Sequence, residues 1–186
     1  MGYEQDLANY YAANLKEQAR NDVVFFISNC CKTFDPRTGK KDLDFKLYPF
    51  QEDYARELAQ HIKEGKDLFV EKSRDMGVSW VTLAVFLWFW LFEDGFQALI
   101  GSRKEDYVDN RAMDSLFGKL DYLIRNLPWR IQGYDPKKMR LFMKLTNPET
   151  KAEILGESAN ENFSRAGRYK VVFFDEMAFW PFQEGS

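Results

Sequence analysis

The spacing of apolar and polar residues predicts helices that alternate with short strands. Apolar residues recur at helical spacing, or fill a continuous block, in four segments: 5–31, 49–65, 79–92 and 104–126. Short apolar runs beside turn residues predict five strands: 67–71, 96–100, 141–145, 151–155 and 170–174. Residues 33–46 carry turn chemistry and are expected to form a loop.

This order of elements favours an α/β fold with a mainly parallel central sheet flanked by helices. The segments 141–145 and 151–155 are joined by a turn-rich stretch, 146–149, and are expected to form a hairpin. In open α/β sheets, ligands bind where the strands reach their carboxyl ends. Residues that directly follow an apolar run are therefore the first candidates for a functional site.

Composition and charge narrow the class of protein only a little. The chain has 186 residues, of which 45% are hydrophobic and 17% aromatic, which favours a packed core over disorder. The net charge of −3 neither indicates nor excludes a nucleic-acid partner, because a basic groove can be local. The longest apolar stretch, 80–92, is shorter than the roughly 18 residues of a membrane span, so no membrane association is expected. The adjacent Cys30 and Cys31 suit a reducing compartment and have no metal-ligand spacing.

Residues 72–79 match part of the phosphate-binding loop pattern that joins a strand to a helix. The eight residues are Lys72, Ser73, Arg74, Asp75, Met76, Gly77, Val78 and Ser79. Gly77 and Ser79 match the second glycine and the final hydroxyl of G-x-x-x-x-G-K-[ST], but Lys72 replaces the first glycine and Val78 the lysine. The alternative interpretation is an ordinary strand–loop–helix turn with solvated charges.

The physical requirements of a phosphate loop can be met without the full motif. Backbone amides at the start of the helix supply most of an anion cradle, whatever the side chains. Ser79 could offer its hydroxyl oxygen to Mg²⁺, and a cation is still needed against the phosphates. Val78 carries no charge, so that cation would be Lys72 or Arg74, and the sequence leaves both open.

The apolar run 170–174 ends directly in two acids, Asp175 and Glu176. Phosphoryl transfer needs one carboxylate near Mg²⁺ and another that orients the attacking water. Asp175 would be the metal-side acid and Glu176 the catalytic base. A strand followed by an acidic turn is the plain alternative.

Three segments in order resemble the ATPase half of the large terminase subunits of tailed bacteriophages. Tyr48-Pro49-Phe50-Gln51 is similar to the adenine-recognition motif of that family. Residues 71–80 are similar to its deviant phosphate loop, and residues 172–180 to its acidic strand with an aromatic tail. The resemblance covers residues 48–180 and rests on the order and spacing of all three segments.

The resemblance implies a fold and an activity. The fold would be a P-loop NTPase of the additional-strand, catalytic-glutamate type. The activity would be an ATPase that uses ATP and Mg²⁺ to drive double-stranded DNA into a viral capsid. Its partners would be the portal protein, the small terminase subunit and other copies in a ring, usually of five. The location would be the host cytoplasm, at the procapsid portal.

The resemblance also implies a domain division. Residues 1–46 would be a helical lead-in and residues 47–186 the ATPase core, incomplete at its C-terminal end. The coupling motif, the last core strands and the nuclease domain of the family would lie beyond Ser186. No nuclease activity is therefore expected of this chain.

Further residues are candidates with an open alternative each. Gln51 could read the adenine edge, with Phe50 or Tyr48 stacked on the base, or could simply be a polar residue in the first turn of a helix. Members of the resembled family place a finger-type arginine before the acidic strand, which favours Arg165 over Arg168 here, against a solvated loop charge.

A loose basic cluster is a weaker candidate for contact with DNA phosphates. Its members are Arg130, Lys137, Lys138, Arg140 and Lys144. A solvated surface is the more common meaning of such a run. His61, alone on a helix, is expected to have no catalytic role.

Two other functions fit the same residues. A helicase or translocase of another P-loop family has the same order of adenine, loop and acid motifs, although Val78 argues against most of them. A non-enzymatic domain that keeps the fold with an inactive loop is the third hypothesis.

Overall fold

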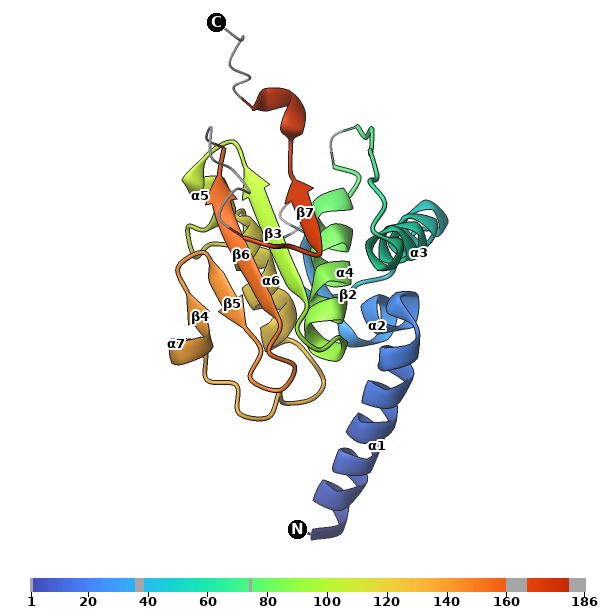
Figure 1. The fold of residues 1–186 in the computed structure, drawn as a ribbon. Helices are drawn as coiled ribbons and strands as arrows, with labels where there is room; N and C mark the ends of the chain where they lie inside the picture. Colours follow the sequence, from blue (N-terminus) through green and yellow to red (C-terminus); the bar gives the residue numbers. More distant parts are fainter. Residues whose placement is uncertain (1, 36–38, 74, 160–166, 181–186) are drawn as a thin grey trace, which may run out of the picture. The chain divides into compact units, whose positions relative to one another are not determined.

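The computed structural model describes residues 2–35, 39–73, 75–159 and 167–180 (Figure 1). The chain divides into two compact units. The first unit comprises Met1–Trp88 with Tyr122–Ile131, and the second comprises Phe89–Asp121 with Gln132–Ser186. In the described part of the chain, none of the helices combines the length and apolar character that crossing a membrane requires.

The first unit begins with two helices where the sequence predicted one over 5–31. Helix α1 (Gly2–Asn21) ends before Asp22, and helix α2 (Val23–Cys30) begins after it. The Asp22 carboxylate accepts hydrogen bonds from the backbone N–H groups of Val24 (2.8 Å) and Phe25 (3.1 Å). An N-cap of this kind starts a new helix at a place that apolar spacing alone does not mark.

The predicted loop over 33–46 was wrong, because it contains a two-stranded hairpin. Strand β1 (Lys32–Asp35) pairs antiparallel with β2 (Lys40–Asp44), with Thr33 opposite Leu43. Asp42 takes a left-handed conformation (φ 56°) and accepts a hydrogen bond from the Tyr122 hydroxyl at 2.9 Å. Tyr122 lies 80 residues from Asp42 in the sequence, so the residues of the turn alone could not predict the hairpin.

Two helices of the first unit confirm their predictions. Helix α3 (Pro49–Glu64) begins at a proline and ends at Gly65, which has the left-handed conformation (φ 66°) of a helix cap. Helix α4 (Val78–Phe92) is buried at every residue from 81 to 91. The Trp88 indole N–H donates to the carbonyl of Ala19 at 2.8 Å, which satisfies a polar group in an otherwise apolar core.

The strand predicted over 67–71, directly before the phosphate loop, was wrong. The structure assigns no strand there, and the side chains of Phe69 and Val70 are 85% and 42% exposed. A β-strand is stabilised by its neighbours, so an apolar run without a neighbour remains irregular.

The second unit is built on a five-stranded sheet with the order β4-β5-β6-β3-β7. Its strands are β3 (Gln97–Ser102), β4 (Arg140–Leu141), β5 (Lys144–Thr146), β6 (Glu153–Ser158) and β7 (Val171–Phe174). Strand β3 pairs in parallel with both β6 and β7, whereas β4–β5 and β5–β6 pair antiparallel. The sheet is therefore mixed rather than mainly parallel, and the fold is mixed α/β with a five-stranded sheet flanked by helices.

Figure 1 shows β6, β3 and β7 side by side with their carboxyl ends at one edge. The strands predicted at 96–100 and 170–174 are confirmed with small shifts at their ends. The predicted hairpin is confirmed in part. Strands β5 and β6 pair antiparallel, and their turn is fixed by the Asn147 side chain donating to the Trp90 carbonyl at 2.8 Å. The strand predicted over 141–145 was wrong as one element, because a turn at Phe142 and Met143 divides it between β4 and β5.

The helix predicted over 104–126 is interrupted. Helix α5 (Glu105–Val108) and helix α6 (Leu116–Arg125) are separated by an irregular stretch in which Arg111 is left-handed (φ 65°). The Asn110 side chain accepts from the Ala112 N–H at 2.8 Å, a local turn that competes with helix. The remaining elements are the short helix α7 (Pro136–Met139) and the 3₁₀ turn η1 (Met177–Phe179).

Candidate functional site

The candidate residues fall into two groups, one in each unit. In the first unit, the predicted phosphate loop, residues 72–79, reaches helix α4 through Gly77, whose φ of 72° favours glycine. A Cβ atom built on Gly77 would lie 2.8 Å from the Gln51 side-chain nitrogen, which is too close. The backbone conformation therefore favours glycine here, and a larger residue would also displace the end of the Gln51 side chain.

Gln51 ties the start of α3 to the phosphate loop. Its side-chain oxygen accepts from the Tyr48 N–H at 3.0 Å, and its side-chain nitrogen donates to the Met76 carbonyl at 2.9 Å. The side chain is buried, with 7% exposed. These two bonds use half of the hydrogen-bonding capacity of an amide, so a direct contact with adenine stays a prediction.

The residues beside Gln51 form an exposed aromatic pair. The rings of Tyr48 and Phe50 stack with centroids 5.8 Å apart and planes 4° apart, and the two residues are 65% and 46% exposed. A parallel pair of exposed rings next to the phosphate loop offers a flat surface on which a base could stack.

The loop itself is short and open. Lys72 and Ser73 are exposed, Asp75 is exposed with a left-handed φ of 65°, and Arg74 lies outside the described residues. Met76, Val78 and Ser79 are half-buried. Ser79 belongs to the first turn of α4, where N–H groups have no partner within the helix and favour an anion.

In the second unit, the acidic pair lies where the parallel strands end. Strand register places Gly101 beside Phe174, and the Asp175 N–H donates to the Gly101 carbonyl at 2.9 Å. Asp175 is half-buried and Glu176 exposed, and Glu176 has a left-handed φ of 53°. A non-glycine residue held in this region is uncommon and turns the chain sharply after the strand.

Two cations that the sequence analysis did not single out approach these acids. The Arg103 Nε lies 4.0 Å from a Glu176 carboxylate oxygen, and the Arg103 guanidinium stacks 5.0 Å from the centre of the Tyr107 ring. Burial lowers the pKa of Lys119, whereas Asp175, Asp114 and Glu176 act in the opposite direction. Arg103 lies three residues after the end of the predicted strand 96–100 and directly after β3 in the structure, whereas nothing in the helical pattern of 104–126 distinguishes Lys119.

Of the two arginines predicted before the acidic strand, the structure describes only Arg168. Arg165 lies outside the described residues, so its expected role as a finger stays a prediction. Arg168 is exposed in the irregular segment before β7.

The basic cluster is not one surface, because one of its members is internal. Arg140 is 5% exposed, and its guanidinium bonds both oxygens of the buried Asp109 at 2.8 and 2.9 Å and the Asp121 carboxylate at 2.8 Å. The suggestion that Arg140 contacts DNA was therefore wrong. Arg130 belongs to the first unit, whereas Lys137, Lys138 and Lys144 belong to the second.

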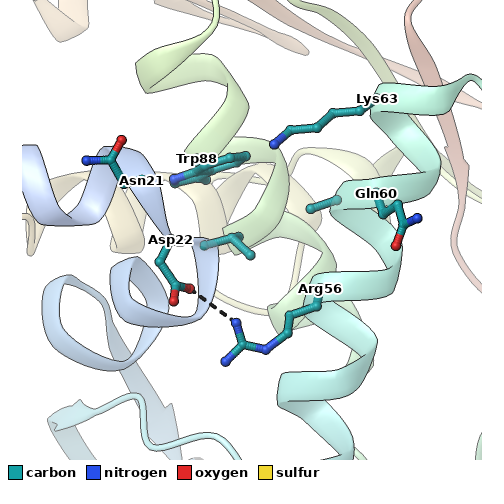
Figure 2. A pocket seen from close by; sticks show the side chains of 8 residues that line it. Asn21, Asp22, Arg56, Gln60, Lys63 and Trp88 are labelled. Carbon is teal, nitrogen blue, oxygen red and sulfur yellow. Dashed lines mark hydrogen bonds and ion pairs between the residues drawn. The ribbon is translucent and has the colours of Figure 1, made fainter.

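His61 has a structural contact, since its Nδ1 lies 2.9 Å from the Asp67 carbonyl oxygen. An open pocket of about 340 Å³ lies nearby in the first unit (Figure 2). Lys63 reaches over the Trp88 ring at 5.0 Å, and Arg56 pairs with Asp22 at 3.5 Å. The charged groups of this pocket are engaged with its own walls, so we assign it no catalysis.

Within the described residues, no three His, Cys, Asp or Glu side chains gather as a metal site. The two expected Mg²⁺ ligands, Ser79 and Asp175, belong to different units. The chain matches no protein-family model, and no curated protein matches it at a significant level.

Proposed function

We propose that the chain is the nucleotide-binding ATPase part of a viral DNA-packaging motor. The single observation that carries the proposal is the link from Gln51 to the Met76 carbonyl beside the left-handed Gly77. It joins the predicted adenine motif to the predicted phosphate loop in one packed arrangement, at the start of a helix. An ordinary turn with solvated charges does not require a buried amide at this point.

In the proposed mechanism, the phosphates would be bound by backbone amides and by one basic side chain. The first-turn amides of α4 would bind phosphate oxygens, and the Ser79 hydroxyl would bind Mg²⁺. Lys72 or Arg74 would neutralise phosphate charge in place of the lysine that Val78 replaces. The donor set of this loop fits a nucleotide, because it offers amides, a hydroxyl and a flexible cation and places no acid other than Asp75 within 72–79.

The acidic side of the mechanism relies on the carboxyl end of β7. Asp175 would hold Mg²⁺ through water, and Glu176 would orient the attacking water and accept its proton. The exposure of Glu176 suits a group that must reach water, and the left-handed turn holds it at the strand end. When bound, Mg²⁺ would supply charge neutralisation on the phosphate oxygens.

Assembly completes the proposal. Copies of the chain would form a ring, usually of five, at the portal in the host cytoplasm, together with the small terminase subunit and double-stranded DNA. Arg165 would act on the nucleotide of a neighbouring copy.

One observation favours a second function, a non-enzymatic domain with an inactive loop. The segment before the phosphate loop forms no strand and exposes Phe69 and Val70, so the loop lacks the rigid entry that a phosphate site normally has. A helicase or translocase of another P-loop family would share the loop and the acids but would need no capsid component.

The test is steady-state ATP hydrolysis by the full chain and by Glu176→Gln, with Glu105→Gln, an exposed acid on α5, as the control. General base catalysis contributes about 10²- to 10⁴-fold, so the Glu176→Gln rate should fall by that factor while Glu105→Gln keeps the wild-type rate. Equal rates in all three proteins would remove Glu176 from the mechanism. Tight nucleotide binding without hydrolysis in the wild type would favour the inactive-loop alternative.

A further inference from the structure

A side-chain hydrogen bond closes the turn that follows β7. The Trp180 indole N–H donates to the carbonyl of Asp175 at 3.0 Å, and the two residues are five apart in the sequence. Both residues are half-buried, so water competes less for this bond than it would at an open surface. The Trp180 backbone N–H also donates to the carbonyl of Met177 at 3.1 Å. Trp180 therefore closes the turn twice, once through its backbone and once through its side chain.

An aromatic contact holds the Trp180 side chain against the sheet. Its ring packs edge to face on the ring of Phe174, with centroids 5.1 Å apart and planes at 67°. Phe174 is the last residue of β7 and lies opposite Gly101 of β3, so strand pairing fixes its place. Edge-to-face pairs of this kind are favourable beyond the area that they bury. The indole is therefore fastened both to the end of the strand and to the Asp175 carbonyl.

Asp175 is held at both of its backbone groups. Its N–H donates to the Gly101 carbonyl at 2.9 Å, which continues the pairing of β7 with β3, and its carbonyl accepts from Trp180. A peptide group is planar, so a bond to the Asp175 carbonyl also orients the N–H of Glu176, which lies in the same plane. The indole bond therefore fixes the direction in which the chain enters Glu176.

Glu176 takes a conformation that a non-glycine residue adopts only when its surroundings impose it. Its φ of 53° and ψ of 41° lie in the left-handed region. Its carboxylate also lies 4.0 Å from the Arg103 Nε, but these side chains are 44% and 37% exposed, and an ion pair of such length and exposure contributes little. Of these two constraints on Glu176, we expect the turn closed by Trp180 to be the stronger.

We propose that Trp180 is a positioning residue for Glu176 and acts through the Asp175 carbonyl. The inference rests on the proposed function for the reaction in which Glu176 takes part, and it adds the residue that aligns this carboxylate. A base that orients an attacking water works within a narrow range of geometry, and a displacement of about 1 Å can cost about 10²-fold in rate. Loss of the indole bond should therefore slow the chemical step and leave the affinity for ATP unchanged.

Steady-state ATP hydrolysis by the full chain and its variants tests the inference. Trp180→Phe keeps an aromatic ring beside Phe174 and removes the indole N–H, so kcat should fall by about 10- to 10²-fold while KM for ATP stays within about twofold. Phe174→Leu keeps the indole N–H and removes the ring contact, so it should lower kcat by a smaller factor. Phe174→Leu also carries the test if Trp180→Phe does not fold.

Trp88→Phe is the matched control. The Trp88 indole N–H also donates to a backbone carbonyl, that of Ala19 at 2.8 Å, but Trp88 belongs to the first unit, whereas the acids belong to the second. Trp88→Phe should keep the wild-type kcat per folded molecule. Chemical denaturation of each variant gives the folded fraction by which its rate is divided.

A double-mutant cycle supplies a measurement that a role in the fold alone would not change. In a Glu176→Gln background, Trp180→Phe should lower the residual rate by less than about twofold, because the carboxylate that Trp180 positions is already absent. If Trp180 served only the fold, its replacement would lower the rate by the same factor in both backgrounds. Hydrolysis of radiolabelled ATP is sensitive enough to measure the residual rates.

The outcomes separate this inference from the proposed function. If Glu176→Gln loses hydrolysis while Trp180→Phe and Phe174→Leu keep the wild-type kcat, the inference is overturned and the proposed function stands. Equal factors for Trp180→Phe in both backgrounds would also overturn the inference. A wild-type rate in Glu176→Gln, or a wild type without hydrolysis, would overturn the proposed function and this inference with it.

Discussion

Two apolar segments lead into the two candidate functional stretches, and they differ in their neighbours. Residues 170–174 carry β7, which pairs along its length with β3 before the chain reaches Asp175. Residues 67–71, before the predicted phosphate loop, also hold a short apolar run, which lies between two acids, but they form no strand, and Phe69 is 85% exposed. The acidic pair is therefore positioned by a sheet, whereas the predicted phosphate loop is bonded by the Gln51 side chain at the Met76 carbonyl.

This difference shows that an apolar run becomes a strand only where another strand can receive its hydrogen bonds. It also shows two ways to place a reactive group. Register fixes Asp175 through backbone bonds to β3, while a buried side-chain amide, that of Gln51, bonds the loop at the Met76 carbonyl.

The largest effect is expected from breaking the ion network of the second unit. Arg140→Ala would leave the buried Asp109 carboxylate without its main partner, and such losses cost about 3–5 kcal/mol in the free energy of unfolding. Lys138→Ala, an exposed neighbour, should change it by less than about 0.5 kcal/mol. Chemical denaturation measures both, and equal effects would mean that the network does not stabilise the sheet edge.

A somewhat smaller loss in the free energy of unfolding is expected from a core substitution in β3, the strand that pairs with β7. Leu99 is fully buried in β3, so Leu99→Ala should cost about 2–5 kcal/mol. Leu141→Ala makes the same change at a half-exposed position of the same sheet and should cost well under that range. A denaturation midpoint that moves equally in both variants would contradict the placement of the core.

The left-handed glycines allow a sharper comparison at the loop. Gly77→Ala would meet both an unfavourable φ and the Gln51 side chain, and should cost about 1–3 kcal/mol and weaken nucleotide binding. Gly65→Ala has nearly the same φ but open space around its Cβ, so it should pay only the conformational cost. Calorimetry with a bound ATP analogue would reveal the difference, and equal losses of binding would remove the special role of Gly77.

The smallest effect is expected in the segment that forms no strand. Phe69→Ser should change the free energy of unfolding by less than about 0.5 kcal/mol, because its side chain is already in solvent. Hydrogen exchange should find the Phe69 amide unprotected and the Val172 amide protected. Strong protection at Phe69 would show that residues 67–71 do pair with another strand, which would contradict the difference drawn here between this segment and β7.

Elements defined by local signals could be predicted from the sequence. Helices α3 and α4 followed from a proline start, a glycine cap and a long apolar block. The hairpin of β1 and β2 could not, because the Tyr122 hydroxyl that anchors Asp42 comes from a distant helix. The break before α6 has a local signal in the Asn110 turn, but the Asp109 carboxylate beside it binds Arg140, which is 31 residues away.

The candidate site was predictable to a similar degree. The motifs marked Gln51, Gly77 and Asp175, but the bond from Gln51 to Met76 joins residues 25 apart and needed the structure. Arg103 and Lys119 become relevant only once the ends of the parallel strands and the start of α6 are in place.

The most direct test of the nucleotide site is binding of a fluorescent ATP analogue with Mg²⁺ to the full chain, to Lys72→Ala and to Arg74→Ala. We predict binding in the wild type that is lost in one of the two variants, which would identify the cation that replaces the missing lysine. Absence of binding by the wild type, or equal binding by all three proteins, would contradict the phosphate loop assigned to residues 72–79.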